Sequence, residues 1–347
     1  MEVTFQGVLD ARRRIGAYLR PTPLVPHPLL SQRLGCEIFV KHENCNPTGS
    51  FKIRGGINLI SRLSEGERKR GVITATRGNH GQSIALACRI FGVPCVIAVP
   101  HGNNPEKNEA MAAYGAELIV HGRDFDEARL RVEELQQERN LRYVHSANEP
   151  QLIHGVGTYA LEILEDLPDP DCILVPVGGG SGISGVLTVF AAAAPKVRVI
   201  GVQAENAAAV TRSWREGKRV ETDSAETIAD GLATRVTFDL PFGILSQKVD
   251  DMATVSEAEL AAAVYEYFRY AHTVAEPAGA APLAAVRQLK DQMAGKKVIL
   301  VLTGANISTG LFREILSGGG KRQEAGGRSQ RSGVRTWDAE RGTRNRL

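Results

Sequence analysis

Short apolar runs alternate with longer amphipathic segments along most of the chain. The runs are rich in β-branched residues, as expected of buried strands: GVIT (71–74), CVIAVP (95–100), ELIV (117–120), YVHS (143–146), CILVPV (172–177), VRVIGVQ (197–203) and KKVILVLT. The segments between them, such as GQSIALACRIFG and SEAELAAAVYEYFRYA, have helical patterns. Apolar strands separated by helices predict parallel sheets covered on both faces, so the fold class is α/β. Two series of strands predict two sheets and two domains, with any ligand at the carboxyl ends of the strands.

The composition is that of a globular protein. Of the 347 residues, 43% are hydrophobic and 23% are charged. No apolar run approaches the roughly 20 residues that a membrane helix needs, so we expect no membrane association. The five cysteines are odd in number and lack metal-ligand spacing, which favours reduced thiols in a cytoplasmic protein.

The C-terminal segment 317–347 differs from the rest of the chain. It contains eight basic and three acidic residues, an excess larger than the net charge of +3 of the whole chain. It is rich in glycine and poor in apolar residues, so burial cannot offset the entropy of ordering it. We therefore expect a disordered basic tail that begins where the folded core ends, near residue 316. No aromatic platform accompanies it, so nucleic-acid binding is not expected.

A glycine-rich loop, VPVGGGSGISG (175–185), follows a strand and opens a helix. Backbone amides without side chains, at the positive end of a helix, suit the binding of a phosphate ester. A tight structural turn would need fewer glycines, so phosphate binding is the better interpretation. The phosphate could belong to a dinucleotide, because Gly180, Gly182 and Gly185 fit G-x-G-x-x-G and Glu205 lies twenty residues after Gly185. A nicotinamide-dependent oxidoreductase is therefore an alternative, but it leaves Lys52 unexplained.

Lys52 follows a turn, NPTGSF, at the start of a predicted helix. The helix dipole disfavours a cation at that position, and Arg54 is close in sequence. Both effects should favour the neutral amine, which Schiff-base chemistry requires. Most lysines are only surface charges, and the setting of Lys52 distinguishes it.

Six segments recur in the order of one enzyme family: ENCNPTGSFKIRGG, TRGNHGQS, VPVGGGSGISG, TIADGLA (227–233), EPAGAA (276–281) and LTGANIS (302–308). From about residue 15 to 316, the chain resembles the fold-type II pyridoxal-phosphate enzymes, and most closely their serine/threonine dehydratase and serine racemase branch. The resemblance implies a two-domain fold like that of the tryptophan synthase β subunit. Residues 1–73 and 149–316 would form the large cofactor-binding domain and 74–148 the small domain. It also implies a homodimer.

The resemblance further implies roles for individual residues. Lys52 would form the Schiff base with pyridoxal 5'-phosphate and later act as base on the substrate Cα. The other implied cofactor contacts are Phe51, Asn79 (ring hydroxyl), Gly178, Gly179, Gly180, Ser181 and Gly182 (phosphate), Gly231 (beside the ring) and Thr303 (pyridine nitrogen). The predicted substrate contacts are Ser50, Thr76, Arg77, Gly78 and His80. The backbone amides from Arg77 to His80 would hold the α-carboxylate of the substrate. A histidine such as His80, taken singly, more often makes a structural hydrogen bond than takes part in catalysis.

The expected reaction follows from the partner of the ring nitrogen. A threonine hydroxyl is neutral and cannot hold a pyridinium as a carboxylate would, so the ring is a weaker electron sink. We therefore expect β-elimination, in which a β-hydroxy amino acid such as L-threonine or L-serine gives a 2-oxo acid and ammonia. The substrate stays open, since 3-hydroxyaspartate and other hydroxylated derivatives also fit. A pyridoxal-phosphate-binding protein without catalysis is a further alternative.

Arg77 departs from the family pattern, because related racemases usually have serine there. An arginine stays protonated and is a poor proton donor, so racemase activity is disfavoured. Its guanidinium could pair with the cofactor, bind a second substrate carboxylate in a bidentate way, or lie in solvent. As a hypothesis, we expect Arg77 to favour an acidic or otherwise polar substrate.

Two further departures concern regulation. Racemase-like relatives hold a divalent cation between two carboxylates, and Gln203 and Ala209 stand at those positions here, with only Glu205 nearby. We therefore expect no metal ion. Larger biosynthetic threonine dehydratases carry a regulatory domain after the core, which the segment 317–347 is too short to supply. Feedback control by isoleucine is not expected.

Overall fold

The larger of the two sheets has six strands in the order β1-β2-β10-β7-β8-β9. In this computed structural model, which describes residues 2–326 (the side chains only to 318), all neighbours in the sheet are parallel except β1 and β2. The strands are β1 (Leu24–Pro26), β2 (Glu37–His42), β7 (Cys172–Pro176), β8 (Arg198–Ala204), β9 (Asp251–Val255) and β10 (Lys297–Leu302). Its connectivity is that of the predicted α/β class.

Helices cover both faces of this sheet. Successive side chains of β10 point to opposite faces of the sheet. Val298 and Leu300 pack towards α2, α12 and α13. Ile299 and Val301 pack towards α8 and α9 on the other face. The helices around this sheet are α1 (Phe5–Ile15), α2 (Pro28–Leu34), α8 (Pro150–Asp166), α9 (Ser181–Ala193), α10 (Ala209–Glu216), α11 (Asp239–Lys248), α12 (Glu257–Ala271), α13 (Pro277–Gln288), α14 (Lys290–Met293) and α15 (Thr309–Gly326). The two apolar cores explain why the central strands read as continuous apolar runs.

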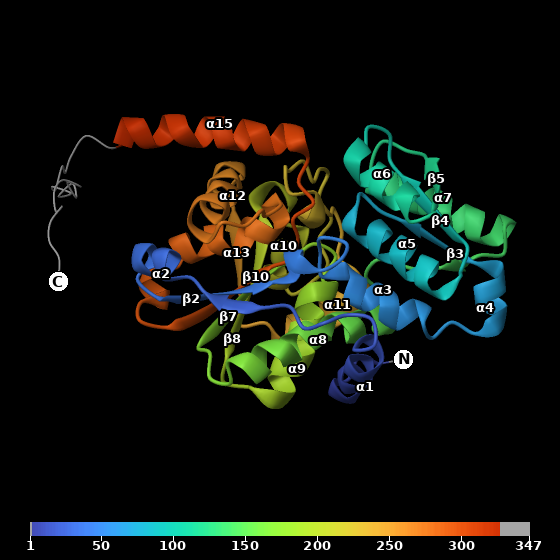
Figure 1. Cartoon of the computed structure of the whole chain (residues 1–347), viewed down its shortest axis with the longest axis horizontal. Coiled ribbons are helices and arrows are strands. Elements are labelled where there is room, and N and C mark those ends of the chain that lie inside the picture. Colours follow the sequence, from blue (N-terminus) through green and yellow to red (C-terminus); the bar gives the residue numbers. More distant parts are fainter. Residues whose placement is uncertain (1, 327–347) are drawn as a thin grey trace, which may run out of the picture.

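The second sheet has four parallel strands in the order β5-β4-β3-β6. With its helices it forms a separate lobe of the molecule (Figure 1). Its elements are β3 (Val72–Ala75), α5 (Asn79–Phe91), β4 (Cys95–Val99), α6 (Pro105–Ala113), β5 (Glu117–Val120), α7 (Phe125–Glu138) and β6 (Arg142–Tyr143). The predicted two sheets are therefore confirmed, while the domain boundaries at 73/74 and 148/149 stay a prediction.

Helix α3 (Lys52–Ile60) lies between the two lobes and packs against both α5 and α8. Glycines permit this close approach. A Cβ on Gly155 of α8 would stand 2.4 Å from the carbonyl oxygen of Arg54, and one on Gly56 would stand 2.3 Å from Oγ of Ser83. Gly56 and Gly155 thus allow α3 to dock at the junction of the two sheets. α4 (Glu65–Arg70) and the short helices η1 (Glu43–Cys45), η2 (Glu205–Ala207) and η3 (Asp230–Leu232) complete the described elements.

The end of the chain differs from the sequence expectation. The core was expected to end near residue 316, but α15 continues to Gly326. Its first turns carry apolar side chains that pack on α12, and the rings of Phe312 and Phe268 meet edge to face at 5.5 Å. The rest of the expected tail, 327–347, lies outside the described residues. No helix in the described part has the length and apolarity to span a membrane.

Candidate active site

A pocket opens between the two sheets, where β3, β7 and β10 end. This is the edge at which parallel α/β sheets bind ligands. Fourteen of the fifteen residues predicted for the site line it: Phe51, Lys52, Thr76, Arg77, Gly78, Asn79, His80, Gly178, Gly179, Gly180, Ser181, Gly182, Gly231 and Thr303. Ser50 does not line the pocket; it is buried behind it, paired with Gly304 in an isolated bridge.

Lys52 is the first residue of α3, and its amine points across the pocket. Nζ donates a hydrogen bond to Oγ of Ser181 at 2.8 Å and lies 4.8 Å from the centroid of the Phe51 ring. Burial lowers the pKa of the Lys52 amine to about 8, although the carboxylate of Glu276 acts in the opposite direction. The expected shift towards the neutral amine is therefore present. Its cause is burial and not the neighbouring Arg54, whose guanidinium is engaged elsewhere.

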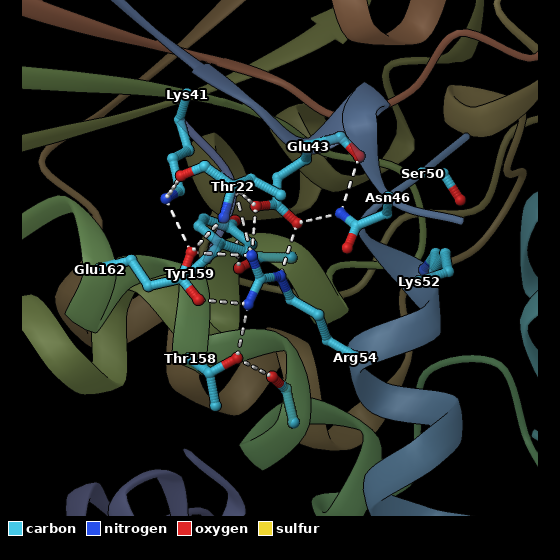
Figure 2. Close-up of polar contacts among 12 residues, drawn as sticks. Thr22, Lys41, Glu43, Asn46, Ser50, Lys52, Arg54, Thr158, Tyr159 and Glu162 are labelled. Carbon is cyan, nitrogen blue, oxygen red and sulfur yellow. Dashed lines mark hydrogen bonds and ion pairs between the residues drawn. The ribbon is translucent and has the colours of Figure 1, made fainter. Parts of the chain in front are cut away.

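Arg54 lies at the centre of a buried ion network behind Lys52 (Figure 2). Its guanidinium binds both oxygens of Glu43, at 2.7 and 2.8 Å, and both oxygens of Glu162, at 2.7 and 2.8 Å. Lys41 donates a further bond to Glu162 at 2.7 Å. All four side chains are at most 2% exposed. The network ties the beginning of α3 to the end of β2, to η1 and to α8.

The turn before Lys52 is joined to the same network. The side-chain amide of Asn46 donates to the carboxylate of Glu43 at 2.9 Å. The backbone carbonyl oxygen of Asn46 accepts a hydrogen bond from the backbone amide of Gly49 at 2.7 Å. The amide of Phe51 then bonds to the carbonyl of Thr303 at 3.0 Å. The asparagine and glycines of ENCNPTGSFK therefore fix the backbone that carries Lys52.

The glycine loop faces Lys52 and opens α9. Gly180 has φ of +92°, and a Cβ there would stand 2.6 Å from Cβ of Pro241. A Cβ on Gly178 would stand 2.1 Å from the carbonyl oxygen of Gly231. A side chain would thus disrupt a cradle of backbone amides at the start of a long helix, which fits a phosphate group.

The loop between β3 and α5 forms the opposite wall. Oγ1 of Thr76 accepts the amides of Gly78 at 2.9 Å and Gly81 at 3.2 Å, so one of the amides expected to hold a carboxylate is already bonded. The amides of Asn79 and His80 begin α5, where N–H groups have no partner within the helix. These two remain suited to an anion.

The side chains of Asn79 and His80 have different settings. Asn79 donates to Glu276 at 2.7 Å and accepts from Asn306 at 2.7 Å. Nε2 of His80 lies 2.9 Å from Oγ1 of Thr74, and burial lowers the pKa of His80 to about 3. A neutral, hydrogen-bonded imidazole supports the loop, in line with the structural alternative considered for His80.

Three charged residues of the site were missed by sequence reasoning: Lys107, Asp230 and Glu276. Asp230 and Glu276 belong to TIADGLA and EPAGAA, so the motifs marked their segments but not their side chains. Nothing in the sequence distinguishes Lys107 on α6. Burial raises the pKa of the Glu276 carboxyl, an effect that Lys107 and the amide of Asn79 oppose.

Glu205, which the dinucleotide alternative requires, does not face this pocket. It is exposed and lines a separate hollow with Arg212 and Asp223. Gln203, at a position where relatives hold a metal ion, accepts two hydrogen bonds from Thr211. The described residues contain no group of three or more His, Cys, Asp or Glu side chains able to hold a metal. The absence of a metal requirement stays a prediction.

Comparison with known proteins identifies the family. Residues 15–304 match the model of the pyridoxal-phosphate dependent enzymes. L-threonine ammonia-lyase of Thermotoga maritima is 41% identical over 91% of this chain and 79% of its own length. L-threo-3-hydroxyaspartate ammonia-lyase of Saccharomyces cerevisiae is 34% identical, over 91% and 97%. The processed threonine deaminase isoform 2 of Solanum lycopersicum superposes with a TM-score of 0.85, at 31% identity, over 91% of this chain and 95% of that one. With its two-sheet fold and a lysine facing a phosphate cradle, the chain belongs to the family of pyridoxal-phosphate dependent enzymes, in their fold type II.

Proposed function

We propose that this enzyme is an ammonia-lyase that converts a β-hydroxy amino acid such as L-threonine or L-serine into a 2-oxo acid and ammonia. The observation that carries the proposal is the position of the Lys52 amine, between the glycine loop and the loop 76–80 in one pocket. The names of the relatives at 41% and 34% identity support the reaction class. The family match removes the nicotinamide alternative.

The proposed roles divide the pocket between cofactor and substrate. The amides of 178–182 would bind the phosphate of pyridoxal phosphate, with Phe51, Gly231, Asn79 and Thr303 around its ring. When bound, this cofactor supplies an electron sink conjugated to the substrate nitrogen, which acidifies the proton on Cα. The amides of Asn79 and His80 would hold the α-carboxylate.

The side chain of Lys52 would move the proton. Its Nζ, with a pKa lowered to about 8, accepts the proton from Cα. The Cβ–O bond would break, and the hydroxyl would take up one proton, equivalent to the one removed from Cα, and leave as water. After release, the enamine product takes up water to give ammonia and the 2-oxo acid, so threonine would give 2-oxobutanoate with no net gain or loss of water. The neutral hydroxyl of Thr303 favours this elimination over reactions that need a protonated ring nitrogen.

Replacing Lys52 tests the assignment. In Lys52→Ala, ammonia release from threonine and serine should fall at least about 1,000-fold, because the variant lacks both the cofactor linkage and the base. Lys69→Ala, which removes an exposed lysine paired with Glu65, is the matched control. Ammonia release that persists in Lys52→Ala would refute the role of Lys52. A wild-type protein that binds pyridoxal phosphate but releases no ammonia from any hydroxy amino acid would support the non-catalytic alternative.

We also propose that the enzyme acts in the cytoplasm as a homodimer. All five cysteines are free thiols and four are buried, which supports a reducing compartment. The dimer rests on the resemblance to the family. Light scattering of the purified holoenzyme tests it, and a monomeric mass at micromolar concentration would contradict it.

A further inference from the structure

Arg77 and Lys107 reach the same side of the pocket from different elements of the small lobe. Arg77 follows β3 and Lys107 lies on α6. Both bind one carboxylate, Asp230 of η3 in the large lobe, at 3.1 Å from Arg77 and 2.9 Å from Lys107. All three line the pocket that holds Lys52. Two cations therefore share the carboxylate of Asp230, and Lys107 also acts on the second acidic side chain of the pocket, Glu276.

The guanidinium of Arg77 is incompletely bonded. Nη2 pairs with Asp230, whereas Nε is buried and has no hydrogen-bond partner among the described residues. A buried N–H without an acceptor is costly, and such a donor is normally matched by a ligand or another polar group. The N–H of Nε is thus a donor with the chemistry to bond to a carboxylate oxygen.

Lys107 brings its charge next to the loop that would hold the substrate. Its aliphatic chain lies across Gly78, where a Cβ would stand 2.5 Å from Cδ of Lys107. The side chain is only 7% exposed, so its ammonium is fixed beside the pocket and not in bulk water. Asp230 holds both cations in position before any ligand arrives.

We infer that Arg77 and Lys107 form a subsite for a second carboxylate of the substrate, which makes a dicarboxylic β-hydroxy amino acid such as 3-hydroxyaspartate the preferred class. The inference rests on the proposed function and specifies its substrate. The methyl group of threonine would leave Nε of Arg77 without an acceptor, whereas a carboxylate at that position satisfies it. A site with polar groups that need a partner discriminates strongly against substrates that lack one.

The test measures kcat/KM for L-threo-3-hydroxyaspartate and for L-threonine, and compares their ratio between variants. In Arg77→Ser and in Lys107→Met the ratio should fall at least about tenfold, because each removes one charge-assisted contact. Arg13→Ser, which removes a highly exposed arginine of α1, is the matched control and should leave the ratio unchanged. A ratio that stays within roughly twofold of wild type in both pocket variants overturns the inference.

A binding measurement keeps the inference separate from the proposed function. Malate and 3-hydroxybutyrate correspond to 3-hydroxyaspartate and threonine without their amino groups, so neither can react with the cofactor. Calorimetric titration of the wild-type holoenzyme should show malate binding at least about tenfold more tightly, and Arg77→Ser should lose that advantage. Equal affinities would overturn the subsite. Absence of ammonia release from every hydroxy amino acid would overturn only the proposed function.

Discussion

The Lys52 amine titrates within the range of ordinary buffers because burial disfavours its charged form. Its pKa is lowered to about 8, so the neutral amine predominates above that pH and the ammonium below it. In apoenzyme, acetylation of Lys52 by a limiting amount of acetic anhydride should rise with pH and reach half its maximum near pH 8. Peptide mass spectrometry measures it, with the exposed Lys69 of the same sample as the internal comparison. A Lys52 midpoint above pH 10 would contradict the burial of the amine.

Single residues of the site were predictable when their role depends on local sequence. The glycines of 178–182 are recognisable as an anion-binding loop because a run of glycines directly before a helix has few other uses. The same reasoning fails for Lys107, whose partner Asp230 lies 123 residues away. Arg54 was seen as a neighbour of Lys52, but its bonds to Glu43 and Glu162 depend on how the chain folds around it.

At the scale of elements, the buried network that holds α3 should dominate local stability. Glu162→Gln would leave the buried Lys41 without a carboxylate partner and the buried Arg54 with Glu43 alone. Removing one partner of a buried ion pair costs about 3–5 kcal/mol, so the free energy of unfolding should fall by that amount. Urea unfolding followed by circular dichroism measures it.

The exposed pair on α4 provides the control for that experiment. Lys69 and Glu65 meet at 2.7 Å, but both are at least 75% exposed. Glu65→Gln should therefore change the free energy of unfolding by less than about 1 kcal/mol. Equal effects of the two Glu→Gln substitutions would show that the buried network contributes no more than a surface pair.

The elements themselves were largely predicted by hydrophobic pattern. The apolar runs became β3, β4, β5, β7, β8 and β10. All of them except β5, whose two end residues are exposed, are mostly buried, and strands buried on both faces must be apolar throughout. YVHS was only partly correct, since β6 covers Arg142–Tyr143 and pairs with two residues of β3. The strands β1, β2 and β9 were missed. In β9 only Met252 and Val255 are buried, which is a weaker signal than a continuous apolar run.

On the scale of the whole molecule, the two lobes are joined by charge pairs on both sides of the pocket. Asp230 binds Arg77 and Lys107, while Arg235, five residues later, binds Asp124 and Asp126 at the start of α7. The large-lobe segment 230–235 thus forms ion pairs with the small lobe through the carboxylate of Asp230 at one end and the guanidinium of Arg235 at the other. The sequence reveals neither pairing, because each joins segments about 100 residues apart or more.

The buried His42 and His80 and the half-buried His145 should make the molecule sensitive to acid. Burial lowers the pKa of His42 to about 4, of His80 to about 3 and of His145 to about 4, from an ordinary value of 6.5. Below pH 6.5 the unfolded chain binds protons that the folded chain does not, so stability falls as the pH drops from 6.5 to 4. Each group contributes up to about 1.4 kcal/mol per pH unit.

Urea unfolding at pH 7, 6 and 5 measures this slope. His42→Gln removes one of the three groups and should make the slope shallower by up to about 1.4 kcal/mol per pH unit. His101→Gln, which replaces an exposed histidine, serves as the comparison and should leave the slope unchanged. A wild-type free energy of unfolding that is constant from pH 7 to 5 would contradict the prediction.

The sequence by itself determined the α/β class, the lysine, the glycine loop and the family, because each is written in contiguous residues whose chemistry acts locally. The tertiary structure alone decided how Arg54 is held, which charges meet across the pocket, and that α15 extends beyond the expected end of the core. These features depend on packing between segments distant in the chain. Such contacts form only when the chain folds, so no local pattern can encode them.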